Sequence, residues 1–404
     1  MAHFRPTSVL GVSVTRGVND QSERIGTLDS LRGLAALSVV FHHCLVVFPA
    51  FWLVYQKGES IPSPPIWWVS YTPVHLLWGG LEAVIVFYVL SGFVLAMPLL
   101  RSNAPSYAAF TVKRFCRIYI PYAGSVLIAA LLLNTTSTFG IRDLSAWFNG
   151  AWSRPVEWST ITDHLLMLGT PKWNYVNPVV WSLVHEMRIS LIFPALMWIA
   201  NRVKWQVLIP LTFLGSGSAK LIHHFIGLDG IGASLMETAS YLFLFVAGAE
   251  LAIHRSSLKR LVGQFGARTQ WTLLIASLVL LNSRWNFVGR VAELRIVLVW
   301  IGAIGIVALI SNPGPWKAAL QYSGLRWLGK ISYSLYLVHL VVLFGMLYTL
   351  QGRVPNAAIV VLSVPVSFLF AALFHRLVEA PSLDLGRRLE RRFGRRLAPL
   401  EAVS

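Results

Sequence analysis

Charged residues are scarce in this chain of 404 residues: they make up 13% of it, whereas an ordinary soluble domain carries about 25%. Hydrophobic residues make up 55%, and the mean hydropathy is +0.62. A soluble protein of this size needs far more polar surface to cover its core. The composition excludes a disordered chain and predicts an all-α fold, a polytopic membrane protein of about ten transmembrane helices.

Cysteine is nearly absent, since the chain contains Cys44 and Cys116 alone. Two cysteines make neither a disulfide framework nor a zinc site, and we expect no bound metal. Residues 1–27 lack an apolar run long enough for a secretory signal, so we expect the first hydrophobic segment to be retained as a span.

Acidic residues are outnumbered two to one, with 17 Asp and Glu against 34 Lys and Arg and a net charge of +17. Such an excess also suits nucleic-acid binding. The basic residues lie, however, in short loops between apolar runs, where positive charge sets membrane topology. We therefore expect the lipid bilayer, and no nucleic acid, as a partner.

Membrane-spanning helices need about 20 predominantly apolar residues each. Ten segments are candidates, the seventh being the shortest: 34–54, 77–100, 118–135, 178–200, 204–225, 238–253, 271–282, 292–311, 331–350 and 357–375. With the N-terminus in the cytoplasm, 24 of the 34 basic residues fall in inner segments and nine in outer ones. This imbalance predicts that both termini are cytoplasmic.

Three parts of the chain follow from this pattern. Residues 1–27 form a polar cytoplasmic segment, 28–384 a membrane domain, and 385–404 a basic cytoplasmic tail expected as a lipid-adjacent helix. The outer segment 136–177 is long and polar yet rich in tryptophan, which indicates an ordered, functional loop. No repeat of 20–50 residues is visible.

Ionisable residues inside spans are candidates for function, because burying a charge in lipid is costly. Arg32 and His43 are eleven residues apart, close to three helical turns, so they share one helix face about 16 Å apart. His42 points about 100° away from His43, and Asp29 lies one turn before Arg32. A cation at the mouth and an imidazole at depth suit an enzyme that handles a long anionic ligand. A snorkelling arginine with an interhelical histidine is the structural alternative.

A second group, Arg114 and Arg117, lies at positions i and i+3 near the start of the third span. Two guanidiniums there can clamp phosphate, because arginine binds phosphate with two parallel hydrogen bonds. Ordinary flanking charge that sets topology is the alternative for this pair.

The third group falls in the apolar run 178–200 and comprises Trp181, Ser182, His185, Glu186 and Arg188. Glu186 must pair or protonate in such surroundings. His185 and Arg188 diverge from it on the helix, so each needs a partner on another helix, either in a functional site or in a structural network.

Two further residues lie near the end of the chain. Glu379, with Arg376, is expected to form a charged pair at a helix end. His339 is expected inside a span, where it can serve as an interhelical hydrogen-bond donor.

Six segments together, in chain order, resemble the acyltransferase family 3 membrane proteins, which O-acylate polysaccharides, O-antigen, Nod factors and macrolides. They are LDSLRGLAALSVVFHH, FYVLSGFVLA, KRFCRIYIPY, VVWSLVHEMRISLIFP, LGKISYSLYLVHL and HRLVEAPS, spanning residues 27 to 385. The resemblance implies about ten helices and transfer of an acyl group, usually acetyl from coenzyme A, to a hydroxyl.

Residue by residue, the family's Arg-x10-His motif falls on Arg32 and His43, and its Arg-x-x-Arg motif on Arg114 and Arg117. Its Trp-Ser-Leu-x-x-Glu motif ends at Glu186. The resemblance thus implies that His43 and Glu186 are catalytic and that the three arginines bind coenzyme A, a co-substrate rather than a permanent cofactor. The other motif residues are expected to support them: Asp29, Ser91, Tyr119, Trp181, Ser182, His185, Arg188, His339 and Glu379.

One position departs from the family pattern. Many members carry an aspartate where this chain has Ile85, so any role of that aspartate does not transfer, although Glu82 is near. Some members carry an extracytoplasmic hydrolase-like domain, which we do not expect in this sequence.

The expected activity is acyl transfer from acyl-CoA, at the cytoplasmic side of a bacterial inner membrane, to a carbohydrate or glycoside hydroxyl. A proton-coupled transporter that uses the same His, Glu and Arg residues is the alternative. An intramembrane serine protease is disfavoured because Ser91-Gly92 lacks a nucleophile context. The acceptor, the side of the membrane on which it is modified, the acyl length and the oligomeric state stay open. So does the choice between direct transfer and a relay through an acyl-histidine.

Overall fold

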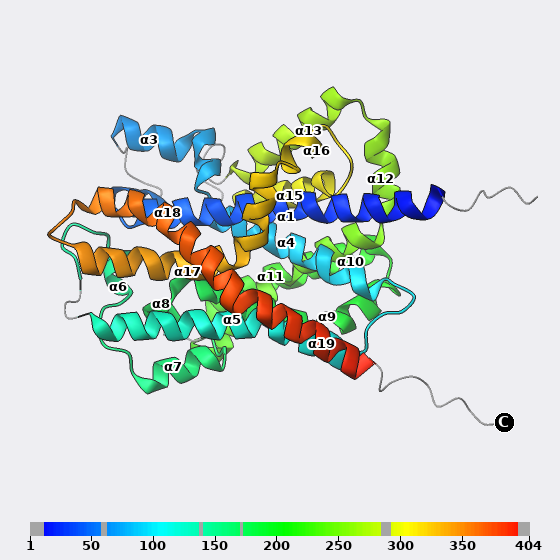
Figure 1. Ribbon diagram of the computed structural model, residues 1–404. Coiled ribbons are helices and arrows are strands. Elements are labelled where there is room, and N and C mark those ends of the chain that lie inside the picture. The colour runs from blue at the N-terminus through cyan, green and yellow to red at the C-terminus, as the bar shows by residue number, and fades with distance from the viewer. Residues whose placement is uncertain (1–11, 58–62, 137–139, 170–172, 284–291, 395–404) are drawn as a thin grey trace, which may run out of the picture.

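The computed structural model describes residues 12–57, 63–136, 140–169, 173–283 and 292–394, and within these ranges all regular structure is helical. The longest helices run side by side through one bundle (Figure 1). The fold is all-α, as the composition predicts.

The long helices of the bundle are α1 (Val12–Val46), α4 (Gly80–Leu99), α5 (Tyr107–Thr135), α9 (Trp181–Ala200), α10 (Trp205–Ile226), α11 (Gly230–Ile253), α13 (Ala267–Leu281), α15 (Ala292–Ile310), α17 (Ser323–Leu350) and α18 (Asn356–Phe374). Shorter elements connect them: α2 (Pro49–Lys57), α3 (Pro64–Tyr71), η1 (Pro73–Leu77), α6 (Ala146–Gly150), α7 (Trp158–Leu165), α8 (Trp173–Val176), η2 (Pro178–Val180), α12 (Arg255–Gln264) and α16 (Lys317–Leu320). The η3 turn (His375–Glu379) continues α18 into α19 (Ala380–Gly394).

Six helices of the described residues are long and apolar enough to cross a membrane: Gly80–Leu99, Tyr107–Thr135, Pro178–Ala200, Gly230–Ile253, Ser323–Leu350 and Asn356–Phe393. A seventh span is possible if the bent pair α1–α2 crosses as one. Helices also cover the other expected spans, but α10 is not among these six, and α13 and α15 are shorter, so the described residues do not confirm the predicted number of ten. The chain is an integral membrane protein.

The first expected span, 34–54, is not one continuous helix. Its two halves, Gly26–Val46 and Pro49–Gln56, are bent by 113°. Proline has no backbone N–H and disfavours the helical conformation of the residue before it, so Pro49 ends the first half and begins the second. Hydropathy alone does not register this break, because the apolar run continues across it.

Glycines allow the central helices to touch. A Cβ on Gly33 of α1 would lie 2.7 Å from the backbone nitrogen of Gly329 on α17. Likewise, a Cβ on Gly248 of α11 would overlap the carbonyl of Val89 on α4, and Gly92 of α4 meets Phe245 of α11 in the same way. Small residues of this kind let membrane helices approach at backbone distance.

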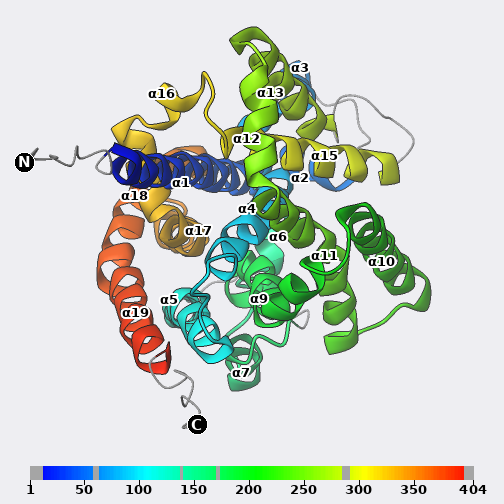
Figure 2. The same cartoon turned by 90° about the vertical axis from the view of Figure 1, so that its right-hand side faces the viewer.

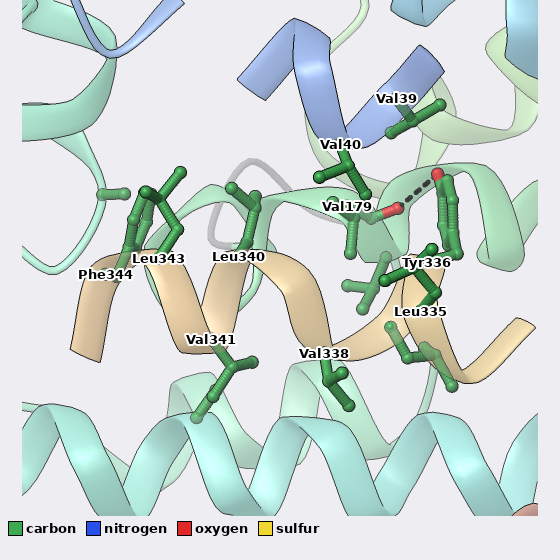
Figure 3. Packing of buried hydrophobic residues seen from close by; sticks show 14 of the residues in the cluster. Val39, Val40, Val179, Leu335, Tyr336, Val338, Leu340, Val341, Leu343 and Phe344 are labelled. Carbon is green, nitrogen blue, oxygen red and sulfur yellow. Dashed lines mark hydrogen bonds between the residues drawn. The ribbon is translucent and has the colours of Figure 1, made fainter. Parts of the chain in front are cut away.

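Two hydrophobic cores result. One joins α1, α5, α17 and the segment 141–152, and the other joins α4, α9, α11 and α15. Within the first, α17 lies between α1, which contributes Val39 and Val40, and α5, toward which Val338 and Val341 point (Figure 3). The candidate site lies where the two cores meet.

The last helix, α19, packs along α5 at one side of the bundle (Figure 2). Lys113 Nζ of α5 lies 2.7 Å from Glu390 Oε2, and Gly386 sits against Cys116. The beginning of α1, the end of α19 and α12 lie at one end of the bundle, and α3 and α6 lie at the other (Figure 1). We call these the terminal end and the loop end.

Candidate active site

A cavity of about 400 Å³ opens among α1, α4, α5, α9, α17, η3 and α19. This volume is in the range of small-molecule sites. The charged and titratable residues that line it come from six of these elements: Asp29, Arg32, Arg117, Glu186, Lys330, His375, Glu379, Asp384 and Arg387. Several motif residues far apart in sequence therefore share one cavity.

Four Arg and Lys side chains line this cavity: Arg32 of α1, Arg117 of α5, Lys330 of α17 and Arg387 of α19. Arg32 lies 3.7 Å from Asp29. Arg117 and Lys330 also line the wall, and neither side chain forms an ion pair or hydrogen bond with any residue that the structure describes. Arg114 is not part of the lining, since its guanidinium lies over the Phe110 ring, 5.9 Å from the ring centre.

Glu186 enters the cavity from α9. Ser91 of α4 donates a hydrogen bond to Glu186 Oε1 over 2.9 Å, and Arg32 lies within electrostatic range of this carboxylate. The partner of Glu186 is therefore a hydroxyl on another helix.

Ser182 and Tyr336 line the cavity on the side of His339. Their hydroxyls lie 2.6 Å apart, and Tyr336 also donates to the carbonyl of Val179 over 2.9 Å (Figure 3). The Tyr336 ring centre is 6.2 Å from that of His339, one turn further along α17. The cavity thus ends one helical turn from His339.

His43 and His339 form a direct pair. Nδ1 of His43 lies 2.9 Å from Nε2 of His339, and Nδ1 of His339 lies 3.0 Å from the carbonyl oxygen of Leu335. Because Arg32 borders the same cavity as Lys330 and Tyr333, both motif residues of α1 lie on the side that faces α17.

Aromatic rings cover the pair toward the loop end. The Trp147 ring of α6 stacks on His43 with ring centres 5.3 Å apart, and Trp52 stands next to Trp147 at 6.4 Å. The tryptophan-rich segment 136–177 therefore reaches the imidazole directly.

His42 has its own partners, although the edge of its ring lies against His43, with ring centres 5.1 Å apart. Its Nδ1 lies 3.2 Å from the carbonyl of Trp78, and its ring packs against Tyr55 and Gly80. The adjacent histidines thus have separate surroundings.

Arg188 forms a different network from the one at Glu186. Its guanidinium donates to Ser234 and Thr238 of α11 and to the backbone carbonyls of Met167 and Leu168, at distances between 2.8 and 3.2 Å. His185 joins this network through Thr238 at 2.8 Å. These contacts hold the loop after α7 against α9 and α11, outside the cavity.

Two other expected residues also lie outside the lining. Tyr119 donates to the carbonyl of Leu165 over 2.8 Å and so holds the end of α7. The Trp181 ring packs against His185 and Tyr241, with centres 5.9 and 6.0 Å away.

Glu379 pairs with different groups than expected. Oε2 lies 2.9 Å from Nδ1 of His375 and accepts a hydrogen bond from Ser334 of α17 over 2.5 Å. The expected partner, Arg376, is exposed. The η3 turn is a π-helix, which shifts the register and brings Glu379 toward α17.

Sequence reasoning missed several cavity residues, among them Lys330, Tyr333 and Tyr336. Their signal was present in the segment LGKISYSLYLVHL. The polar residues Lys330, Tyr333 and Tyr336 recur every three positions, which places them on one face of a helix.

The acyltransferase domain model of family 3 matches residues 25–376. This chain belongs to acyltransferase family 3. It is therefore a membrane acyltransferase, and the predicted family is confirmed.

One curated relative is the peptidoglycan O-acetyltransferase OatA of Listeria monocytogenes. It is 22% identical over 382 residues, which cover 88% of this chain and 55% of that protein. The chain thus spans about half the length of this relative. No solved structure matches the chain.

Proposed function

We propose that this protein is an O-acyltransferase that moves an acyl group, acetyl in the first instance, from acyl-CoA to a carbohydrate hydroxyl. The observation that carries the proposal is the cavity that begins at Arg32, Arg117 and Lys330 and ends one turn from the His43–His339 pair. The family match supports acyl transfer rather than proton-coupled transport.

The donor is expected to bind with its phosphates at the terminal end. Arg117 and Lys330 form no ion pair or hydrogen bond with the described residues, so their charges can neutralise phosphate. Arg32 to His43 spans about 16 Å along α1, roughly the length of the pantetheine arm. Phosphates held by the cations thus bring the thioester near His43. By the basic-residue count, this end faces the cytoplasm of a bacterial inner membrane.

The chemistry requires one base. As the acceptor oxygen attacks the thioester carbonyl, its proton passes to His43; the carbon–sulfur bond then breaks and the departing thiolate recovers that proton. Histidine is the side chain best matched to this task near neutral pH. Glu186, in this scheme, orients substrate groups in the cavity rather than transferring the proton.

The acceptor is expected to arrive from the loop end. Trp147 stacks on His43 there, with Trp52 beside Trp147, and aromatic faces stack well against the C–H faces of sugar rings. OatA is named for O-acetylation of peptidoglycan, a carbohydrate polymer. A sugar hydroxyl is therefore the acceptor class we propose.

Purified protein in nanodiscs tests the proposal with radiolabelled acetyl-CoA and a panel of soluble glycan acceptors. We expect acceptor-dependent release of CoA thiol together with label on the glycan as an alkali-labile ester. Transport of label into sealed vesicles without ester formation would instead support the transporter.

A further inference from the structure

The His43–His339 pair has a fixed pattern of hydrogen-bond donors and acceptors. The Leu335 carbonyl only accepts, so Nδ1 of His339, 3.0 Å away, carries a proton. His339 is 1% exposed, and no carboxylate among the described residues contacts its ring. A charged imidazole is unfavourable in such a place, so His339 is neutral and its Nε2 is an acceptor.

The state of His43 follows from that of His339. Its Nδ1 lies 2.9 Å from the accepting Nε2 of His339 and therefore carries a proton. In neutral His43 the lone pair is then on Nε2. No residue that the structure describes bonds to this atom, and the ring is only half-buried.

We infer that His339 is the positioning residue that holds His43 in the tautomer whose Nε2 is free to take the acceptor proton. This inference rests on the proposed function. His339 here does what a carboxylate does in a Ser-His-Asp triad, where the third group fixes tautomer and ring orientation. A neutral imidazole serves instead of a carboxylate, which avoids a buried negative charge in the membrane.

The proton path is complete without another reactant. The acceptor hydroxyl gives its proton to Nε2 of His43 while its oxygen forms the ester bond, and the resulting imidazolium returns the proton to the coenzyme A thiolate. Through both steps the Nδ1 proton of His43 stays on the hydrogen bond to His339. His339 itself touches neither substrate.

Three variants at this position separate positioning from packing. His339→Gln keeps a carbonyl oxygen that can accept from His43, His339→Leu fills similar space without an acceptor, and His224→Leu on exposed α10 is the control. In a serine protease the wrong tautomer of the base costs about 10⁴-fold in kcat. We expect His339→Leu to lose about 10²-fold or more in kcat with an unchanged KM for acetyl-CoA, and His339→Gln to recover at least about tenfold of that loss.

A spectroscopic readout covers the case in which a variant fails to fold. In wild-type protein with ¹⁵N-labelled histidine, the His43 signals, assigned by their loss in His43→Gln, should show a protonated Nδ1 and a bare Nε2. His339→Leu should shift His43 toward the tautomer protonated at Nε2, which free histidine prefers.

The inference is overturned by a protonated Nε2 in wild-type His43, or by a folded His339→Leu variant with wild-type kcat. Either result leaves the proposed function intact if wild-type protein forms ester and His43→Ala does not. Absence of ester formation by wild-type protein would instead remove the proposed function itself.

Discussion

The hydroxyl of Ser91 donates a hydrogen bond to Glu186 over 2.9 Å, between α4 and α9, at the wall of the cavity. A neutral donor leaves the charge of this carboxylate uncompensated by direct pairing. The carboxylate is thus available to a bound substrate or to Arg32, which lies within its electrostatic range.

Replacement of Glu186 by glutamine is expected to lower turnover at least about tenfold, the minimum for a charge that acts on substrate. The amide oxygen can still accept from Ser91, so the melting temperature should stay near that of wild type. Ser91→Ala, which removes the hydrogen bond but keeps the charge, is the matched control and should be milder. Full activity of Glu186→Gln would leave this residue without a catalytic role.

The two arginines of the Arg-x-x-Arg pair are expected to differ. Arg117 lines the cavity and Arg114 does not, so Arg117→Ala should raise the KM for acetyl-CoA about 10- to 100-fold, the cost of one charge-assisted hydrogen bond to phosphate. Arg117→Lys should lose part of this, because lysine lacks the planar fork. Arg114→Ala should raise the KM less, and Arg101→Ala, at an exposed position, should not change it. Equal KM values for all these variants would mean that Arg117 does not bind the donor and only contributes to membrane topology.

Close contact between α1 and α17 should be sensitive to one methyl group. A Cβ on Gly329 would overlap the carbonyl of Asp29, so Gly329→Ala is expected to destabilise the protein by about 1–3 kcal/mol or more. Gly263→Ala on α12, where nothing lies within 4 Å, should be neutral or slightly stabilising. Thermal unfolding of both variants in detergent gives the comparison, and equal melting temperatures would argue against this helix crossing.

The topology prediction concerns opposite ends of the bundle. Ser159 of α7 and Ser257 of α12 are both exposed. Single cysteines are placed at these positions in a variant whose buried Cys44 and Cys116 are replaced. They should react with a membrane-impermeant maleimide from opposite sides of the membrane. Ser257→Cys should react only after the membrane is permeabilised, which exposes its cytoplasmic side. Labelling of both from the same side would contradict the assignment of cytoplasmic termini.

Helical periodicity predicted part of the site without any structure. Arg32 and His43 are eleven positions apart, about three helical turns, and both side chains face α17. Periodicity within one helix says nothing of the partner helix, however. Only the packing of α17 against α1 shows that Lys330 shares the cavity with Arg32 and that His339 pairs with His43.

Hydropathy did not predict where α5 begins or which groups bind Arg188. Helix α5 begins at Tyr107, where the Ser106 side chain caps it, eleven residues before the expected span. Hydropathy marks the membrane-buried part of a helix, whereas capping marks its end. Arg188 finds partners in the backbone carbonyls of Met167 and Leu168, and backbone groups leave no signature in sequence.

The central claim is that His43 is the general base of the reaction. The adjacent residue, His42, provides the control. His43 contacts His339 beside the cavity, whereas His42 contacts the Trp78 carbonyl on another face. The most direct measurement compares His43→Ala and His42→Ala in single-turnover ester formation, with acetyl-CoA binding measured separately by calorimetry. We predict that His43→Ala binds donor normally but loses about 10²–10⁴-fold in rate, the range for a removed general base, and that His42→Ala is much milder. A folded His43→Ala variant of near wild-type rate, or an essential His42 beside a dispensable His43, would contradict the account.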